Sequence, residues 1–108
     1  MECALSSKQC TPCNGNTPAL TQPQIDRLLT QLEGWQQQGS SITKTYAFKN
    51  YYQTIAFVNA LAWMTHKEDH HPELTAGYNS CCIVYSTHAI HGLSENDFIC
   101  AAKADALF

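Results

Sequence analysis

The sequence predicts an α+β protein: a four-stranded antiparallel sheet with three helices packed on one face, in the order α-β-β-α-β-β-α. Three observations lead to this prediction. Three segments carry apolar residues at steps of three and four, as amphipathic helices do. Each of these segments begins with a polar residue that is suited to cap a helix. Two further stretches alternate with a period of two residues, which is typical of half-buried strands.

The chain of 108 residues has the size of one compact domain, and 44% hydrophobic residues are enough for a single core. Residues 1–20 contain prolines, a glycine and asparagines without apolar periodicity. We interpret them as an irregular N-terminal lead-in that has the potential to be mobile. Residues 21–108 are predicted to form the folded domain.

The first predicted helix starts at Thr21, which serves as its N-cap. Gln24 occupies the capping-box position three residues later, and Pro23 suits the first turn. Leucines continue the helical spacing as far as Leu32. Gly34 then provides the stop signal.

One β-hairpin is predicted before the central helix and one after it. In residues 35–48 the pattern alternates around a turn at residues 39–41, with Ile42 and Tyr46 on the same face. The second hairpin runs from Leu74 through a turn near Asn79 to a strand over residues 81–88.

The central helix is predicted to start at Asn50 as N-cap and to end before Pro72. A set of residues recurs at steps of three and four along this helix and so shares one face of it. These residues are Tyr52, Ile55, Ala56, Asn59, Ala62, Trp63 and His66.

The third helix begins with the capping box Ser94-Glu95-Asn96-Asp97. Among the aromatic residues, we interpret Phe57, Trp63 and Tyr78 as core residues rather than as groups that stack on a ligand.

Charge and hydropathy exclude several classes of partner. The formal net charge is -3, and only six Lys and Arg residues are present, all scattered. Binding to nucleic acid or to an anionic membrane would favour a clustered basic patch. The longest apolar-leaning stretch, residues 55–64, falls well short of a membrane span, and the first residues lack the pattern of a signal peptide. We therefore expect a cytoplasmic protein with no nucleic-acid and no membrane partner.

The six cysteines do not form a convincing disulfide framework. Cys81 and Cys82 are adjacent and point to opposite faces of a strand, and Cys100 lies in a helical pattern. Reduced thiols are the better interpretation for a protein without a signal peptide. Cys10 and Cys13 form a single C-x-x-C pair, which is a weak indication of metal or redox chemistry.

Four of the five histidines lie in two short segments, residues 66–73 and 86–88. Pro72 forces His71 into an extended conformation at the helix exit, and His88 is predicted to project from the end of a strand. Imidazole titrates near pH 6.5, so neighbouring histidines can present both a base and an acid at neutral pH. Elimination of water needs both groups, one to accept a proton and one to protonate the departing hydroxyl.

The same residues allow simpler interpretations. A His-His-Pro sequence at a helix end can be an exposed cap that interacts favourably with the helix dipole. His66 and His70 have the i,i+4 spacing of a zinc half-site that His88 would complete, although no Glu or Cys stands at a matching spacing. The capping box with Ser94 explains an acidic residue at Asp97 without any catalysis.

A set of spaced residues resembles the signature of the pterin-4a-carbinolamine dehydratases. It consists of His66-x-x-x-His70-His71-Pro72 followed at fixed distances by Tyr78, His88 and Asp97. The similarity covers the chain from about Leu20 to its end, and the lead-in with its two cysteines is similar to bacterial members. Many members place Glu where His66 stands.

This resemblance implies the dehydration of 4a-hydroxytetrahydropterin to quinonoid dihydropterin, with no metal or organic cofactor. The step recycles the pterin used by an aromatic amino acid hydroxylase, which implies a functional link to an enzyme such as phenylalanine hydroxylase. It also implies a homodimer or a homotetramer. By resemblance, the catalytic residues are His70, His71 and His88, with Asp97 orienting or tuning a histidine, and the substrate-binding residues are Asp69, Pro72, Glu73, Ser86 and Thr87.

Three alternatives remain open at this point. One is a redox protein that uses the C-x-x-C pair, in which Cys10→Ser would abolish activity, whereas we expect that change to leave dehydration untouched. A non-catalytic pterin-binding protein, or a regulatory partner of a hydroxylase, could retain the fold without the activity, although the presence of all three histidines weighs against it. A metal-binding protein would use His66, His70 and His88, and metal analysis of the purified protein would test that alternative.

Overall fold

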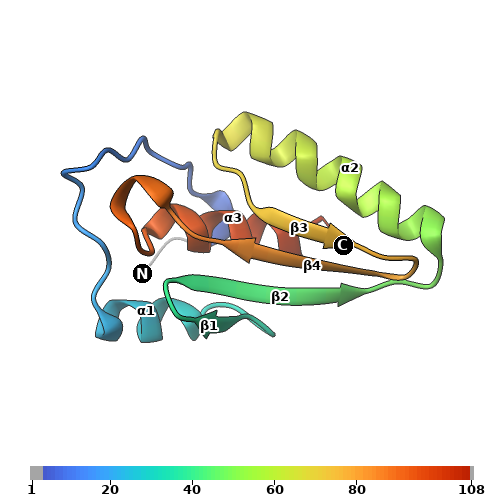
Figure 1. Cartoon of the computed structure of the whole chain (residues 1–108), viewed down its shortest axis with the longest axis horizontal. Helices are drawn as coiled ribbons and strands as arrows, with labels where there is room; N and C mark the ends of the chain where they lie inside the picture. The colour runs from blue at the N-terminus through green and yellow to red at the C-terminus, as the bar shows by residue number, and fades with distance from the viewer. Residues whose placement is uncertain (1–3, 108) are drawn as a thin grey trace.

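The computed structural model describes residues 4–107, and its elements follow the predicted order (Figure 1). The predicted α+β class and the antiparallel sheet are confirmed. The helices are α1 (Gln22–Leu29), α2 (Tyr51–Glu68) and α3 (Glu95–Asp105); the strands are β1 (Gln36–Gln38), β2 (Ser41–Ala47), β3 (Glu73–Ala76) and β4 (Ser80–Tyr85); two short 3-10 helices are η1 (Leu5–Ser7) and η2 (His88–Ile90).

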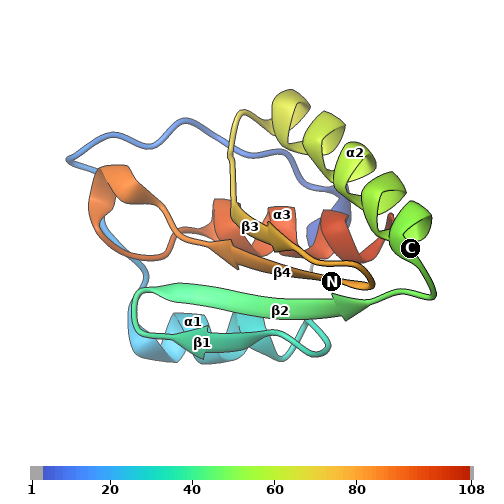
Figure 2. The ribbon, with the colours of Figure 1, turned by 45° about the vertical axis from the view of Figure 1, so that its right-hand side comes forward.

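The four strands pair antiparallel in the order β1-β2-β4-β3. Every second residue of β4 is buried, so Cys81, Ile83 and Tyr85 face the core while Cys82 and Val84 lie on the other face. The register places Tyr46 of β2 opposite Cys81. The helices cover the face that carries these buried residues and leave the opposite face open (Figure 2).

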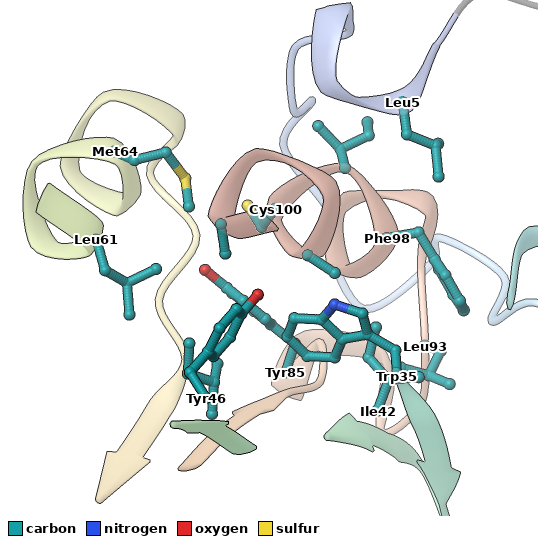
Figure 3. Packing of buried hydrophobic residues seen from close by; sticks show 14 of the residues in the cluster. Leu5, Trp35, Ile42, Tyr46, Leu61, Met64, Tyr85, Leu93, Phe98 and Cys100 are labelled. Carbon is teal, nitrogen blue, oxygen red and sulfur yellow. The ribbon is translucent and has the colours of Figure 1, made fainter. Parts of the chain in front are cut away.

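The core lies between the two central strands and helices α2 and α3. Leu61 and Met64 of α2 point from one side and Phe98 from α3, above the aromatic rings of the sheet (Figure 3). Tyr46 packs against Phe57 with ring centroids 4.6 Å apart. This packing fixes the end of α2 and the start of α3 relative to β4, which is where the predicted site residues lie.

Helix α2 buries a different face from the predicted one. Its buried residues are Thr54, Phe57, Leu61, Met64 and Thr65. The prediction that Trp63 and Tyr78 belong to the core is wrong, because they are 66% and 67% exposed, whereas Phe57 is buried as predicted. Two sets of largely apolar residues recur at helical spacing in this helix, and periodicity does not tell which set faces the sheet.

The local capping signals are confirmed at all three helices. Thr21 and Gln24 form a capping box at α1, and Ser94 and Asp97 form another at α3. The side chain of Asn50 accepts a hydrogen bond from the backbone N–H of Gln53 at 2.9 Å.

Two predicted ends differ from the structure. The regular part of α1 stops at Leu29, and the chain continues to Leu32 in tighter turns with i to i−3 hydrogen bonds. Strand β4 ends at Tyr85 rather than reaching His88. The backbone of Thr87 pairs with Gly92, and this bridge closes the turn that contains η2.

The described part of the lead-in is irregular but docked on the domain (Figure 1). Leu5 is 4% exposed and belongs to the core cluster. Lys103 of α3 donates to the backbone carbonyl of Ser6 at 3.1 Å, and Leu20 N–H donates to Leu93 at 2.9 Å. The division of the chain at residue 20 stays a prediction. None of the helices within residues 4–107 combines the length and the apolar character needed to span a membrane.

Asp105 ties the end of α3 to the sheet. Its carboxylate accepts hydrogen bonds from the Tyr46 hydroxyl, from Lys44 Nζ at 2.9 Å and from Trp35 Nε1 at 3.2 Å. Burial, with the bond to Asp105 as the next cause, raises the pKa of Tyr46, so the phenol stays protonated and donates. We expect Asp105→Ala to lower the free energy of unfolding by about 1.5–3 kcal/mol, because three donors lose a charged acceptor.

Equilibrium unfolding in urea measures this loss. Asp26→Ala is the control, since Asp26 is an exposed residue of α1. It should change the free energy of unfolding by less than about 0.5 kcal/mol. An equal loss in both variants would contradict the role given to Asp105.

Candidate functional site

A sharp turn after α2 places the two adjacent histidines. The helix ends at Glu68, and Asp69 adopts a left-handed conformation with φ 54° and ψ 41°. The backbone N–H of His70 donates back to Thr65 at 3.3 Å and closes the turn. His70 and His71 therefore follow the helix instead of continuing it.

His70 contacts a buried carboxylate. Its Nε2 lies 2.6 Å from Oδ1 of Asp97, whose exposed fraction is 0%. The other carboxylate oxygen accepts from Thr87 Oγ1 at 2.8 Å and from the backbone N–H of Ser94 at 3.0 Å. A carboxylate can be buried when donors satisfy both oxygens, as they do here. Asp97 thus caps α3 as predicted and also holds His70.

Tyr85 supports the same histidine from the sheet. The rings of His70 and Tyr85 stack with centroids 5.6 Å apart and an interplanar angle of 8°. Burial raises the pKa of Tyr85, so this phenol stays neutral beside the imidazole. The ring of His70 is therefore fixed by a hydrogen bond at one edge and by packing on one face.

A cavity of about 540 Å³ opens at this end of the sheet, and we call it the larger cavity. The end of α2, the residues that follow β4, the first turn of α3 and the lead-in all contribute to its wall. Six of the predicted site residues line it, namely Asp69, His70, His71, Ser86, Thr87 and His88.

A smaller cavity of about 320 Å³ lies beside the larger one. Its wall includes Glu73, Val84 and His91. Both cavities share four residues, which are His71, Ser86, Thr87 and His88. Two of the exposed histidines, His71 and His88, therefore border both spaces.

Three of the predicted site residues do not line the larger cavity. Asp97 is buried behind His70, Glu73 lines only the smaller cavity, and Pro72 lines neither. His88 reaches the site from the first residue of η2 and not from a strand as predicted.

The sequence interpretation missed the part of the wall that comes from the lead-in. Residues 10–13 line the larger cavity. The backbone N–H of Cys10 donates to Glu68 Oε1 at 2.9 Å, and Thr11 exchanges two hydrogen bonds with Asn96. Pairs that are 58 and 85 residues apart leave no local periodic signal. The C-x-x-C pair was the one sequence signal noted in this segment, as a weak indication of metal or redox chemistry.

The zinc half-site that the spacing of His66 and His70 left open as an alternative does not form with its helical geometry. His66 is exposed on α2 and contacts the Trp63 ring, whereas His70 lies past the helix end on Asp97. Within residues 4–107, no three His, Cys, Asp or Glu side chains come together as a metal site. The cysteines of the described segment are free of disulfides.

The arrangement is suited to proton transfer in a partly enclosed space. Two exposed imidazoles border the cavity, and a third is held by a buried carboxylate. Imidazole can donate or accept a proton near neutral pH, so such a set can supply an acid and a base to one bound molecule.

Comparison with known proteins gives a consistent result. A family model described as pterin 4 alpha carbinolamine dehydratase matches residues 18–107. A protein of Nitrosospira multiformis is 62% identical over 104 residues, which cover 96% of this chain and 92% of that protein. A protein of Bdellovibrio bacteriovorus is 59% identical over 93 residues, with coverage of 82% and 78%. Both carry the provisional name pterin-4-alpha-carbinolamine dehydratase.

Two solved structures share the fold. A transcriptional coactivator/pterin dehydratase from Brucella melitensis matches with a TM-score of 0.80 and 32% identity, covering 82% of this chain and 97% of that one. A pterin dehydratase-like protein, identified as a RuBisCO assembly factor in the alpha-carboxysome, matches with a TM-score of 0.62 and 32% identity, covering 69% and 89%.

Proposed function

Because this chain belongs to the pterin-4-alpha-carbinolamine dehydratase family, we propose that it dehydrates 4a-hydroxytetrahydropterin to quinonoid dihydropterin by histidine acid–base catalysis. The observation that carries the proposal is the larger cavity, in which His70, His71 and His88 meet. Its wall of mixed polar and apolar groups and its size suit a small heterocycle that carries polar groups.

The reaction requires two proton transfers. One of His71 and His88 accepts the proton from the pterin N5, and the other protonates the 4a-hydroxyl, which departs as water when the C4a–O bond breaks. Both side chains are exposed at the cavity and so can reach a bound molecule. Imidazoles supply both the acid and the base, so this chemistry uses no metal or organic cofactor.

His70 and Asp97 complete the acid–base set. The contact between them orients the His70 ring, and the stacking on Tyr85 prevents its rotation. Asp69, Ser86 and Thr87 contact the pterin ring from the cavity wall. Pro72 and Glu73 continue the extended segment that positions His71, with Glu73 facing the smaller cavity.

The protein acts in the cytoplasm as a homodimer or homotetramer and serves an aromatic amino acid hydroxylase such as phenylalanine hydroxylase. The unusual exposure of large aromatic side chains supports self-association, since Tyr52 and Trp63 of α2 are 84% and 66% exposed. The sheet edges at β1 and β3 offer further surface.

The test is the rate at which quinonoid dihydropterin appears from freshly generated 4a-hydroxytetrahydropterin, followed by absorbance. We expect the protein to accelerate the step at least ~100-fold over the spontaneous reaction, since a single positioned acid or base supplies that much. A folded protein that leaves the spontaneous rate unchanged would contradict the proposal.

A second candidate function is a non-catalytic role, as a pterin-binding protein or as a regulatory partner of a hydroxylase. The observation that favours it is the solved neighbour that is pterin dehydratase-like and was identified as an assembly factor. The same assay distinguishes the two functions when binding is measured beside it. Saturable pterin binding without acceleration supports the second function.

A further inference from the structure

We propose that Cys10 and Cys100 are an oxidation site, at which a peroxide joins the two thiols in a disulfide that tethers the lead-in to α3. The two sulfur atoms lie 3.5 Å apart although the residues are 90 positions apart in the chain. A disulfide bond is about 2.0 Å long, so the sulfurs must approach by roughly 1.5 Å. Cys10 belongs to a segment outside any helix or strand, whose backbone is less constrained than that of α3.

The two thiols differ in access. Cys100 is 0% exposed in the core, whereas Cys10 is partly exposed and lines the larger cavity. The hydrogen bond with Cys10 and, after it, burial raise the pKa of Cys100, so this group stays a protonated thiol. An oxidant that enters the cavity therefore meets Cys10 before Cys100, which does not line the cavity.

The reaction balances with hydrogen peroxide as the oxidant. The Cys10 thiol gives up its proton as its sulfur attacks one peroxide oxygen, the O–O bond breaks, a sulfenic acid forms, and the departing hydroxide takes up that proton as the first water. The Cys100 sulfur then attacks the sulfur of Cys10, the S–O bond breaks, and the hydroxide leaves with the thiol proton as water. In total, two thiols and one peroxide give one disulfide and two waters.

The geometry selects Cys100 over Cys13 as the partner. Cys13 is the other half of the C-x-x-C pair, but its sulfur accepts a weak hydrogen bond from Asn96 Nδ2 at 3.5 Å. The Cys10 sulfur contacts Cys100 and the backbone carbonyl of Asn96. The sequence motif alone would suggest the pair Cys10–Cys13.

The tether would fix one wall of the larger cavity. The backbone N–H of Cys10 binds Glu68, whose other oxygen lies 3.7 Å from Lys103 Nζ, so α2, the lead-in and α3 already meet here. A disulfide between Cys10 and Cys100 holds this junction together covalently for as long as the two cysteines stay oxidised. It closes a loop of about 90 residues, for which the entropic stabilisation by a disulfide is large.

The experiment uses the full chain, fully reduced and then treated with hydrogen peroxide. We expect the number of free thiols to fall by two per chain and peptide mapping to identify a Cys10–Cys100 disulfide. The midpoint of thermal unfolding should rise by at least ~5 °C in the oxidised protein. Hydrogen exchange of residues 8–13 should also become slower. These readouts need no pterin and do not depend on the proposed function.

Two variants make the test specific. Cys82→Ser is the matched control, since Cys82 lies on the open face of the sheet, and it should form the disulfide as the unmodified chain does. Cys100→Ser should form no disulfide with Cys10 and show no rise in the midpoint. A Cys10–Cys13 disulfide in the unmodified chain or in Cys82→Ser, a bond between chains, or oxidation without any disulfide overturns the proposal even if Cys100→Ser does not fold.

Discussion

Replacing His71 by alanine is expected to lower kcat for pterin dehydration by a factor of about 10²–10⁴. His71 is exposed and borders both cavities, so its imidazole can contact a bound substrate. The substitution removes one of the two groups that exchange protons with N5 and the 4a-hydroxyl. KM should change much less than kcat, because the lost interaction acts mainly in the transition state.

His71→Ala should leave the fold intact, which makes the activity loss interpretable. The side chain is exposed and makes no hydrogen bond within the described residues, so the free energy of unfolding should change by less than about 0.5 kcal/mol. His66→Ala is the control, since His66 is an exposed histidine on the outer side of α2. The assignment of His71 fails if both variants retain the activity of the unmodified chain.

Local sequence signals predicted the helix starts and the helix exit that surround the site. The capping residues Thr21, Asn50 and Ser94 set three helix starts, because capping depends on groups only two or three residues away. Pro72 correctly indicated a helix exit at His71, but the helix already ends at Glu68, so His70 lies past its end and not on it as the sequence suggested. These features are decided within one turn of chain and are therefore visible without a structure.

Features that depend on distant contacts were not predictable in the same way. The burial of Phe57 rather than Trp63 depends on where α2 lies on the sheet. The lead-in lacks periodicity, yet Leu5 enters the core and Cys10 lines the cavity. The position of His88 on η2 depends on the bridge between Thr87 and Gly92, which has no strong local signature.

Asp97 has one role that local sequence signals predict and a second role that depends on a distant contact. The sequence explains it as a capping residue, and the structure confirms that role with the bond from Ser94 N–H at 3.0 Å. The contact with His70, 27 residues away, adds a second role that the capping pattern neither requires nor excludes. One fully buried carboxylate thus connects the start of α3, the segment after β4 and the turn after α2.

Asp97→Ala is expected to lower the free energy of unfolding by about 3 kcal/mol or more. Three donors lose a charged acceptor, namely His70, Thr87 and the Ser94 N–H, and a buried donor left without a partner costs roughly 1–3 kcal/mol. Thr87 Oγ1 keeps its contact with Ser94 Oγ at 2.7 Å. Equilibrium urea unfolding measures the loss. Glu95→Ala, in the same helical turn but exposed, should cost less than about 1 kcal/mol.

A loss of stability alone would not show that Asp97 positions a histidine, so a conservative variant is needed. Asp97→Asn keeps the size of the side chain and one oxygen that can cap α3, but its amide nitrogen, in place of Oδ1, cannot accept a hydrogen bond from His70. In folded Asp97→Asn we expect a lower kcat with little change in KM, and a shifted NMR signal of the His70 ring. If the ring signal and kcat both match the unmodified chain while stability falls, Asp97 acts only as a cap, and the orientation of His70 must come from the stacking on Tyr85.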